Sequence, residues 1–312
     1  MKDKGIQLQE GMSLYEFLEK YGTDEQCVEE LARHRWPKGF KCPACGHSQA
    51  SYIKTRGLYQ CVRCDHQTSV TSGTIFHSTK LPLKKWFMAI YLLTQSKNSI
   101  SSLELKRHIG VTHNTAYRVK QKIMQVMLCR NKTKPIGGTI IVDDSYPGGE
   151  KTGKRGRGAA GKTPFIAAVE LNEKGYPMRI KLNSVKRFSN HEIAKWSAAN
   201  IRPGSHITSD GLACFAAVCA SGHTHTGIIT GSGKAAVTNA TFTWVNTILG
   251  NIKNSLCGTY HSFDHQHPDR YLAEFEYRFN RRFKLKDMLP RFIHVAARTA
   301  PCTSSMLRFS EY

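Results

Sequence analysis

Acidic residues and long apolar runs are both scarce in this sequence of 312 residues. Asp and Glu number 23 against 45 Lys and Arg, which gives a net charge of +22 and a pI near 9.7. Because each Lys or Arg that neutralises a phosphate releases a condensed counterion, this excess favours nucleic acid as the partner. A solubility charge or a ribosome-associated surface is the alternative. No run of about 18 apolar residues occurs, so we expect no membrane-spanning helix.

The sequence also lacks a secretory signal and a disulfide-type cysteine pattern. Its first residues, MKDKGIQLQEG, do not show a basic stretch followed by an apolar one. Of the ten cysteines, four are grouped and six are scattered. Grouped cysteines in an intracellular chain indicate metal ligation rather than disulfides. We therefore expect a cytoplasmic protein.

The four grouped cysteines form two Cys-x-x-Cys pairs with fifteen residues between the pairs. Each pair places two thiolates on one tight turn, and two such turns close a tetrahedral Zn²⁺ site with no open position, so the zinc is expected to be structural. The intervening residues suit a β-hairpin. The pattern predicts a zinc ribbon over residues 37–80, after an N-terminal helical segment at 1–36. The expected ligands are Cys42, Cys45, Cys61 and Cys64.

Residues 81–131 show the spacing of a helix-turn-helix. Ser101 or Ser102 can cap the first helix, Gly110 provides the turn, and Thr112 can cap the second helix. The residues expected to face the core are Leu103, Leu105, Ile109, Ala116, Val119 and Ile123. The side chains left on or near the outer face to contact DNA bases and phosphates are His113, Asn114, Tyr117, Arg118 and Lys120. An ordinary helical hairpin with a charged outer face is the alternative.

The rest of the sequence alternates between short apolar runs and helical patterns. Three antiparallel strands followed by two strand–helix units predict a ribonuclease H-like α/β domain with a mixed five-stranded sheet at 136–290, before a C-terminal tail at 291–312. The whole chain is thus expected to be multidomain α+β. The predicted strands are Thr139–Asp144, Pro164–Leu171, Tyr176–Leu182, His206–Ser209 and His225–Ile229, and the predicted helices are Asn190–Asn200, Gly211–Ser221, Thr241–Leu256 and Asp269–Arg281.

A basic, glycine-rich loop, KTGKRGRGAAGK, joins the first two of these strands. Its glycines make it too flexible to pack against a core. We interpret it as a contact to the DNA backbone through Lys154, Arg155 and Arg157, with a disordered hairpin tip as the alternative.

Two of the short apolar strands end in aspartate, at Asp143 and Asp144 in TIIVDDS and at Asp210 in SHITSD. In a ribonuclease H-like sheet the first and fourth strands are neighbours, so Asp143 and Asp210 would converge. A charge buried there needs a cation. Carboxylates suit Mg²⁺, with Mn²⁺ as a substitute, and such a site can activate a water or a 3′-hydroxyl for phosphodiester displacement.

Each aspartate has an alternative interpretation. Asp143 and Asp144 precede a Pro-Gly-Gly turn and can be turn residues, while Asp210 can be a helix N-cap. Asp144 also competes with Asp143, because adjacent side chains on a strand point to opposite faces and only one of them is then expected to join the site.

The helix TFTWVNTILGNIKNSLCGTYHSF, which should supply a third metal ligand, contains no acid. Asn246 and Lys253 are seven residues apart and lie on one face of it, where Asn can offer a neutral oxygen to a metal and Lys can contact a phosphate. Glu274 and Glu276 are the nearest downstream acids and can compensate for the missing negative charge as auxiliary residues, with Arg278 beside them. Glu274 can instead form a helical ion pair with Arg278.

These segments resemble, in the same order, the bacterial insertion-sequence transposases of the DDE type that carry an N-terminal zinc ribbon. The resemblance extends from Trp36 to Phe283. It rests on RWPKGFKCPACG, YQCVRCDHQTSVTSGTIFHSTKLPLKKWF, VDDSYPGG, TSDG, WVNTILGNIK, GTYH and YLAEFEYRFNRR.

The family pattern Asp-Glu-x-Tyr-x-Gly-Gly matches VDDSYPGG and implies that Asp143 is the first catalytic aspartate, with Asp144 as its variable neighbour. Asp210 matches the second aspartate. The third acidic position falls on Asn246 and the family lysine on Lys253, so the chain is similar to an ISXO-like branch with an Asp-Asp-Asn-Lys set.

The resemblance implies metal-dependent cleavage at transposon ends and joining of the 3′-hydroxyl to double-stranded target DNA. Asp143, Asp210 and Asn246 would hold Mg²⁺, and Lys253 would position phosphate. The zinc ribbon and helix-turn-helix would recognise terminal inverted repeats within a homodimer or higher synaptic complex. The alternative is a catalytically inactive DNA-binding protein, either a regulator or a domesticated transposase, which the missing third carboxylate would suit.

Overall fold

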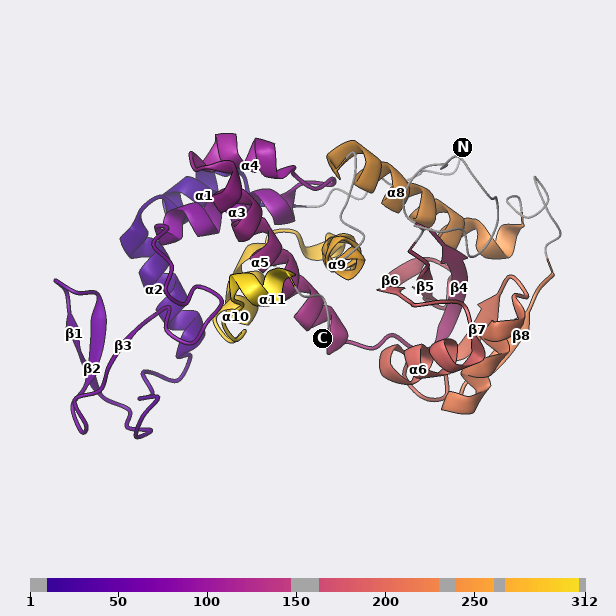
Figure 1. Cartoon of the computed structure of the whole chain (residues 1–312), viewed down its shortest axis with the longest axis horizontal. Coiled ribbons are helices and arrows are strands. Elements are labelled where there is room, and N and C mark those ends of the chain that lie inside the picture. Colours follow the sequence, from indigo (N-terminus) through magenta and orange to yellow (C-terminus); the bar gives the residue numbers. More distant parts are fainter. Residues whose placement is uncertain (1–9, 147–162, 230–238, 261–266, 309–312) are drawn as a thin grey trace. The chain divides into compact units, whose positions relative to one another are not determined.

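The chain divides into two units. Figure 1 shows its helices and strands, coloured in the order of the sequence. The computed structural model describes residues 10–146, 163–229, 239–260 and 267–308. Unit 1 holds Met1–Ser96, Ser102–Val126 and Arg282–Glu311, and unit 2 holds Lys97–Ser101 and Met127–Arg281. In the part of the chain that the structure describes, no helix is both long and apolar enough to span a membrane.

Unit 1 contains the two short N-terminal helices that the sequence predicts, α1 (Leu14–Tyr21) and α2 (Asp24–Arg35). Both begin with a reciprocal cap, since Ser13 and Glu16 exchange backbone-to-side-chain hydrogen bonds at the start of α1, and a Thr–Gln pair does the same for α2. These helices pack on α3 (Leu83–Gln95), and α10 (Met288–Ala296) packs on α2 and α3. The short helix α11 (Ser304–Arg308) follows.

A three-stranded antiparallel sheet in unit 1 carries the grouped cysteines. Its strands are β1 (Ala50–Ile53), β2 (Leu58–Cys61) and β3 (Gln67–Ser69), in the order β1-β2-β3. The first two strands form the hairpin predicted between the two cysteine pairs, which is therefore confirmed. The third strand was not predicted.

The helical pair predicted after α3 is present as α4 (Ser102–Ile109) and α5 (His113–Lys132). Gly110 makes the turn with a φ of 59°, and the Thr112 hydroxyl accepts a hydrogen bond from the Thr115 N–H at 3.3 Å, as expected of a cap. Five of the six predicted core residues are buried. Leu103 is 54% exposed, against the prediction, because it lies two positions before Leu105 and hence about 200° around the helix from it.

Unit 2 is built on a mixed sheet of five strands in the order β6-β5-β4-β7-β8. The three strands β4, β5 and β6 pair antiparallel, whereas β7 lies parallel to β4 and β8 parallel to β7. The number of strands and their positions confirm the prediction to within two residues. The strands are β4 (Thr139–Ser145), β5 (Phe165–Leu171), β6 (Pro177–Ser184), β7 (His206–Ser209) and β8 (Thr224–Gly227).

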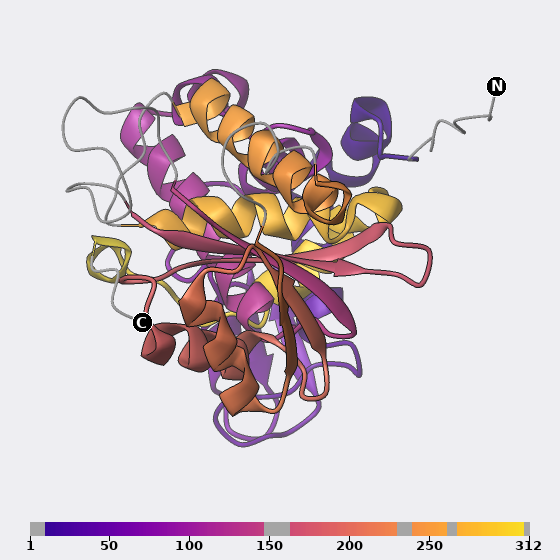
Figure 2. The same ribbon diagram turned by 90° about the vertical axis from the view of Figure 1, so that its right-hand side faces the viewer.

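Helices cover both faces of this sheet, which Figure 2 shows nearly edge-on with α6 on one side and α8 on the other. An apolar core joins one face to α6 (Asn190–Asn200) and to the 3₁₀ helix η1 (Ala213–Ser221). The other side carries α8 (Thr243–Tyr260), which packs on β4 and β5 after the short 3₁₀ turn η2 (Ala240–Phe242), and α9 (Pro268–Phe279), which packs on β6.

The segment after β7 differs from the α-helix predicted at Gly211–Ser221. Gly211 has a φ of +83° and Leu212 is extended, so helical geometry begins only at Ala213 and is then 3₁₀. A further 3₁₀ turn, η3 (Arg282–Lys284), follows α9.

Candidate functional site

Two aspartates follow paired positions on the neighbouring parallel strands β4 and β7. Val142 of β4 is in register with Ser209 of β7, and the next residues are Asp143 and Asp210. Because the two strands run parallel and in register, Asp143 and Asp210 lie side by side, and their carboxylate oxygens are within 4.8 Å of each other. The convergence predicted for these two residues is confirmed.

The face that Asp143 occupies follows from strand alternation. Ile140 and Val142 belong to the core beneath α6, together with Ala168, the partner of Val142 on β5. Since neighbouring side chains alternate, Asp143 points to the face on which α8 packs. The sequence left this face undecided.

Asp144 joins the two aspartates even though alternation sends it toward the α6 face. One carboxylate oxygen from each of Asp143, Asp144 and Asp210 lies within 4.8 Å of the other two, and all three side chains are half-buried. The expectation that only one of the adjacent aspartates can approach Asp210 is therefore wrong. It assumed regular alternation within a complete sheet, whereas the pairing of β4 with β7 ends at Val142, so β7 no longer flanks Asp143 and Asp144.

The Asp210 side chain is held by a tight turn. Gly211 adopts a left-handed φ of +83°, and one Asp210 carboxylate oxygen accepts a hydrogen bond from the Leu212 N–H at 3.2 Å. The Ile228 N–H donates to the Ser209 carbonyl at 2.9 Å, which fixes the end of β7 from the neighbouring chain segment. Asp210 thus forms an Asx turn rather than the N-cap that was the alternative, because the cap position of η1 is Leu212 and has no side-chain cap bond, and Asp210 also contributes to the acidic group.

The donor chemistry of this acidic group fits a hard divalent cation. Unit charges 4.8 Å apart repel by roughly 3 kcal/mol at an effective dielectric constant of about 20, so three such carboxylates gain from a cation between them. Carboxylate oxygens are ligands that Mg²⁺, Mn²⁺ and Ca²⁺ accept. The residues that would hold the ion are Asp143, Asp144 and Asp210.

Helix α8, which carries Asn246, begins toward the other end of the sheet. The ring of Trp244, in the first turn of α8, is 6.2 Å from the ring of Tyr176, which directly precedes the start of β6. Pro177, the first residue of β6, pairs with Leu171 of β5, and Leu171 pairs with Thr139 of β4. Thr139 precedes Asp143 by four residues, or about 13 Å along the strand. Asn246 is half-buried there.

The C-terminal end of α8 lies toward the same end of the sheet as the three aspartates. Tyr260 stacks edge-on against Tyr271 of α9 at 4.6 Å, and Asp269 of α9 accepts a hydrogen bond from the N–H of Ser184, the last residue of β6. Lys253 is exposed and follows Asn246 by two helical turns in this direction. The carboxylate distances therefore unite the three aspartates, and the role of Asn246 as a further ligand stays a prediction.

The downstream acids of α9 have other partners. The Glu274 carboxylate accepts hydrogen bonds from the Ser99 hydroxyl and the Tyr260 hydroxyl, and it is 1% exposed. Burial, followed by the Glu274 charge, raises the pKa of Tyr260 well above its ordinary value. The Arg278 guanidinium donates hydrogen bonds to the backbone carbonyls of Glu274 and Lys97, so it links α9 to the chain segment at Lys97.

Glu276 forms a second buried pair, with Lys181 of β6. Their charged atoms are 3.5 Å apart, and the Glu276 carboxylate accepts a hydrogen bond from the Leu182 N–H at 3.0 Å. Burial raises the pKa of Glu276 to about 7, against the opposing attraction of Lys181. These contacts give Glu276 a structural role between α9 and β6.

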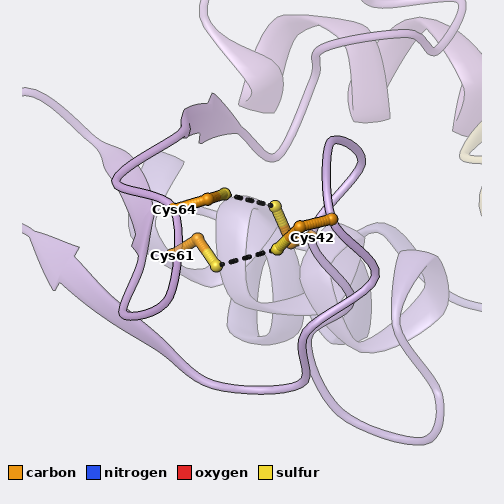
Figure 3. A group of neighbouring side chains, drawn as sticks. Cys42, Cys61 and Cys64 are labelled. Atoms are coloured by element: carbon orange, nitrogen blue, oxygen red, sulfur yellow. Dashed lines mark hydrogen bonds between the residues drawn. The ribbon is translucent and has the colours of Figure 1, made fainter.

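The four grouped cysteines of unit 1 form a closed sulfur cluster. Figure 3 shows Cys61 and Cys64 facing Cys42 across a short gap. The sulfur atoms of Cys42 and Cys64 are 3.7 Å apart, those of Cys45 and Cys61 are 3.5 Å apart, and all four lie within 4.8 Å of one another. Tetrahedral Zn²⁺ with bonds of about 2.3 Å would separate its sulfur ligands by about 3.8 Å. The cluster therefore fits zinc and leaves no open position.

The two cysteine turns repeat each other. In the first, the Gly46 N–H donates to the Cys42 carbonyl at 2.9 Å, and in the second, the Asp65 N–H donates to the Cys61 carbonyl at 3.0 Å. Gly46 and Asp65 both adopt a left-handed φ, 73° and 54° respectively. Asp is one of the few side chains that tolerates this conformation. This repetition aims two thiolates from each turn at a common centre.

The residues predicted to contact DNA divide into three groups. His113, Asn114, Tyr117 and Arg118 are exposed on the first two turns of α5, as expected. Lys120 is 2% exposed, against the prediction, because α5 is buried almost all round from Val119 to Met124 and has no outer face there. The loop residues Lys154, Arg155 and Arg157 lie outside the described residues.

Comparison with known proteins places both sites in matched segments. Residues 22–67 match the transposase zinc-ribbon domain, and residues 135–280 match the ISXO2-like transposase domain. A 144-residue stretch is 28% identical to an uncharacterized protein in transposable element ISH50 of Halobacterium salinarum. That stretch covers 45% of this chain and 46% of the relative, so the two share less than half of either length.

The two matched domains define a class of protein, the transposases of insertion sequences. The chain belongs to the transposase family that carries a zinc ribbon and an ISXO2-like transposase domain. The resemblance predicted from the sequence is thereby confirmed. The grouping of Asp144 with the other two aspartates was missed, and its acidic character next to Asp143 was the signal that could have revealed it.

Proposed function

We propose that the chain is a DNA transposase that cleaves the ends of its insertion sequence and joins the 3′-hydroxyl to target DNA by metal-dependent phosphodiester transfer. The observation that carries this proposal is the meeting of Asp143 and Asp210 at the ends of adjacent parallel strands, inside the segment that matches a transposase domain. A bound Mg²⁺ or Mn²⁺ would polarise the phosphodiester and lower the pKa of the attacking hydroxyl.

The sheet order supports a ribonuclease H-like fold for residues 136–290. Three antiparallel strands followed by two parallel ones on the other side of β4 bring the first and fourth strands together, which is the arrangement such a site requires. Asp143 and Asp210 hold the cation in this proposal. The roles of Asn246 as a further ligand and of Lys253 as a phosphate contact rest on the family resemblance alone.

Unit 1 would recognise the terminal inverted repeats. In this proposal the zinc ribbon at 37–80 and the helix-turn-helix at 81–131 contact the DNA, and the exposed side chains at the start of α5 enter the major groove. The excess of basic residues supplies phosphate contacts. Because an element has two ends, a homodimer or larger synaptic complex would hold both, acting on DNA in the cytoplasm.

Strand cleavage and joining on labelled DNA that carries the element's ends tests this proposal. Wild type is compared with Asp143→Ala, Asp210→Ala, Asn246→Ala and Asn246→Glu in Mg²⁺ and in Mn²⁺. We expect cleavage by the wild type and none by either aspartate variant. Tight binding of the ends without cleavage by the wild type, rescued only by Asn246→Glu, would instead favour an inactive DNA-binding protein.

A further inference from the structure

Asp144 has the geometry of a metal ligand, although its family position is that of a variable neighbour. Its carboxylate lies within 4.8 Å of those of both Asp143 and Asp210. We propose that Asp144 is the third carboxylate ligand of the divalent cation and supplies the negative charge that the neutral Asn246 lacks. This inference rests on the proposed function, because it presumes that Asp143 and Asp210 bind the same ion.

The end of β4 explains how two adjacent residues reach one site. Strand pairing stops at Ser145, whose partner is Phe165, the first residue of β5. The Asp144 N–H donates to a carboxylate oxygen of Asp143 at 2.8 Å, so the two residues are tied locally at this edge. Both side chains are half-buried, so they remain reachable from solvent.

Within the described residues, the other acids near this side of the sheet are already engaged. Glu274 accepts hydrogen bonds from Ser99 and Tyr260, Glu276 is paired with Lys181 and with the Leu182 N–H, and Asp269 accepts a hydrogen bond from the Ser184 N–H. Helix α8, where the family pattern places its third acid, has none over Thr243–Tyr260. Asp144 is therefore the third carboxylate that these residues bring to Asp143 and Asp210.

This role makes Asp144 act in opposite directions with and without metal. Without a cation, three nearby negative charges repel one another, so neutralising one of them relieves repulsion in the folded state. With a cation, the same change removes a ligand and weakens binding. A merely structural aspartate would show neither pattern, because its loss would lower stability equally in both conditions.

The test measures Mn²⁺ binding by calorimetry and thermal unfolding of the full zinc-loaded chain, with and without Mn²⁺. The variants are Asp144→Asn, which keeps shape and removes charge, and Asp143→Asn as the reference for a lost ligand. Glu173→Gln removes an equal charge at the exposed β5–β6 turn and is the matched control. We expect Asp144→Asn to weaken Mn²⁺ binding at least tenfold, to unfold at the same or a higher temperature without Mn²⁺, and to lose most of the Mn²⁺-induced shift.

The outcomes separate this inference from the proposed function. Mn²⁺ binding that Asp143→Asn abolishes and that Asp144→Asn leaves within twofold of wild type would overturn the role of Asp144 alone. A lower unfolding temperature of Asp144→Asn in both conditions, with unchanged affinity, would overturn it too. Absence of Mn²⁺ binding by the wild type would overturn the proposed metal site and this inference together.

Discussion

Asp143 and Asp210 are the residues that directly follow Val142 and Ser209, a register pair on the parallel strands β4 and β7. This relationship converts two aspartates 67 positions apart in the sequence into neighbours within 4.8 Å. Asp143 is held within β4, whereas Asp210 lies between the end of β7 and the turn at Gly211. We therefore expect the turn to matter to metal binding as well as the acids themselves.

Replacing Gly211 by alanine should displace Asp210. Gly211 has a φ of +83°, and an added Cβ would lie 3.5 Å from the Ile228 carbonyl oxygen. The left-handed backbone alone costs a non-glycine residue about 1–2 kcal/mol. We expect Gly211→Ala to lower the free energy of unfolding by about that amount and to weaken Mn²⁺ binding, as measured by denaturant unfolding and calorimetry.

Gly204→Ala is the matched control for this change. Gly204 has a φ of +76°, and a Cβ added there would have no heavy atom within 4 Å, so it carries the same backbone penalty away from Asp210. Gly204→Ala should lose similar stability and keep wild-type Mn²⁺ affinity. Equal Mn²⁺ affinities for the two variants would show that the turn does not position Asp210.

Each chain should bind one structural zinc. The sulfur separations of 3.5 and 3.7 Å fit a tetrahedral ion, so Cys45→Ser should lower the zinc content of purified protein from one ion to near zero. Elemental analysis measures this directly. Cys219→Ser, at an exposed cysteine of unit 2, should keep one zinc, and equal zinc loss from both variants would contradict the assignment.

Arg118 should contribute to DNA affinity through phosphate or base contact. Arg118→Ala should weaken binding to the element's ends, and if the contact is to phosphate, the slope of log affinity against log salt should fall by about one. Arg33→Ala removes an equal charge from an exposed arginine of α2 and is the control in fluorescence anisotropy titrations. Identical salt slopes and affinities for the two variants would argue against α5 as the recognition helix.

Lys120 should behave differently from Arg118. Because its side chain is 2% exposed, Lys120→Ala should lower the free energy of unfolding through lost packing and lost polar contacts, by about 1–3 kcal/mol. Denaturant unfolding in the absence of DNA measures this. A variant with unchanged stability and reduced DNA affinity would restore Lys120 to the DNA-contacting group.

His223 should make the protein less stable at acidic pH. The ring is 6% exposed, and burial lowers its pKa below the ordinary value of 6.5. As the pH falls through about 6.5, His223 takes up a proton in the unfolded chain but not in the folded chain. The free energy of unfolding therefore has its full value above pH 6.5 and decreases below it. His223→Leu should flatten the fall in unfolding free energy between pH 7.5 and about 5.5, by at most about 1.4 kcal/mol per pH unit. Parallel curves for wild type and variant would contradict this.

The sequence predicted those features that depend on spacing along the chain. The two Cys-x-x-Cys pairs, the apolar runs of β4 and β5 and the turn at Gly110 each have a local cause, and the structure contains all of them. The adjacency of Asp143 and Asp210 followed because a parallel pairing of the first and fourth strands aligns their ends.

Features set by three-dimensional surroundings were not predictable in the same way. Lys120 has the composition of a surface residue, and nothing in the periodicity of α5 shows that the helix becomes buried all round at this point. The backbone of Asp144 pairs in regular register with Ile166 of β5, so alternation predicts that its side chain points away from Asp143. Its carboxylate nevertheless lies within 4.8 Å of those of Asp143 and Asp210. Helix α10 packs on α2 and α3 across more than 190 residues of sequence, which no local pattern encodes.

The most direct test of the metal site is anomalous X-ray scattering from crystals soaked in Mn²⁺. The account predicts a manganese peak about 2.0–2.3 Å from carboxylate oxygens of both Asp143 and Asp210. A zinc peak among Cys42, Cys45, Cys61 and Cys64 serves as the internal control in the same crystal. A clear zinc peak with no manganese between the two aspartates would contradict the central claim that this pair holds the catalytic cation.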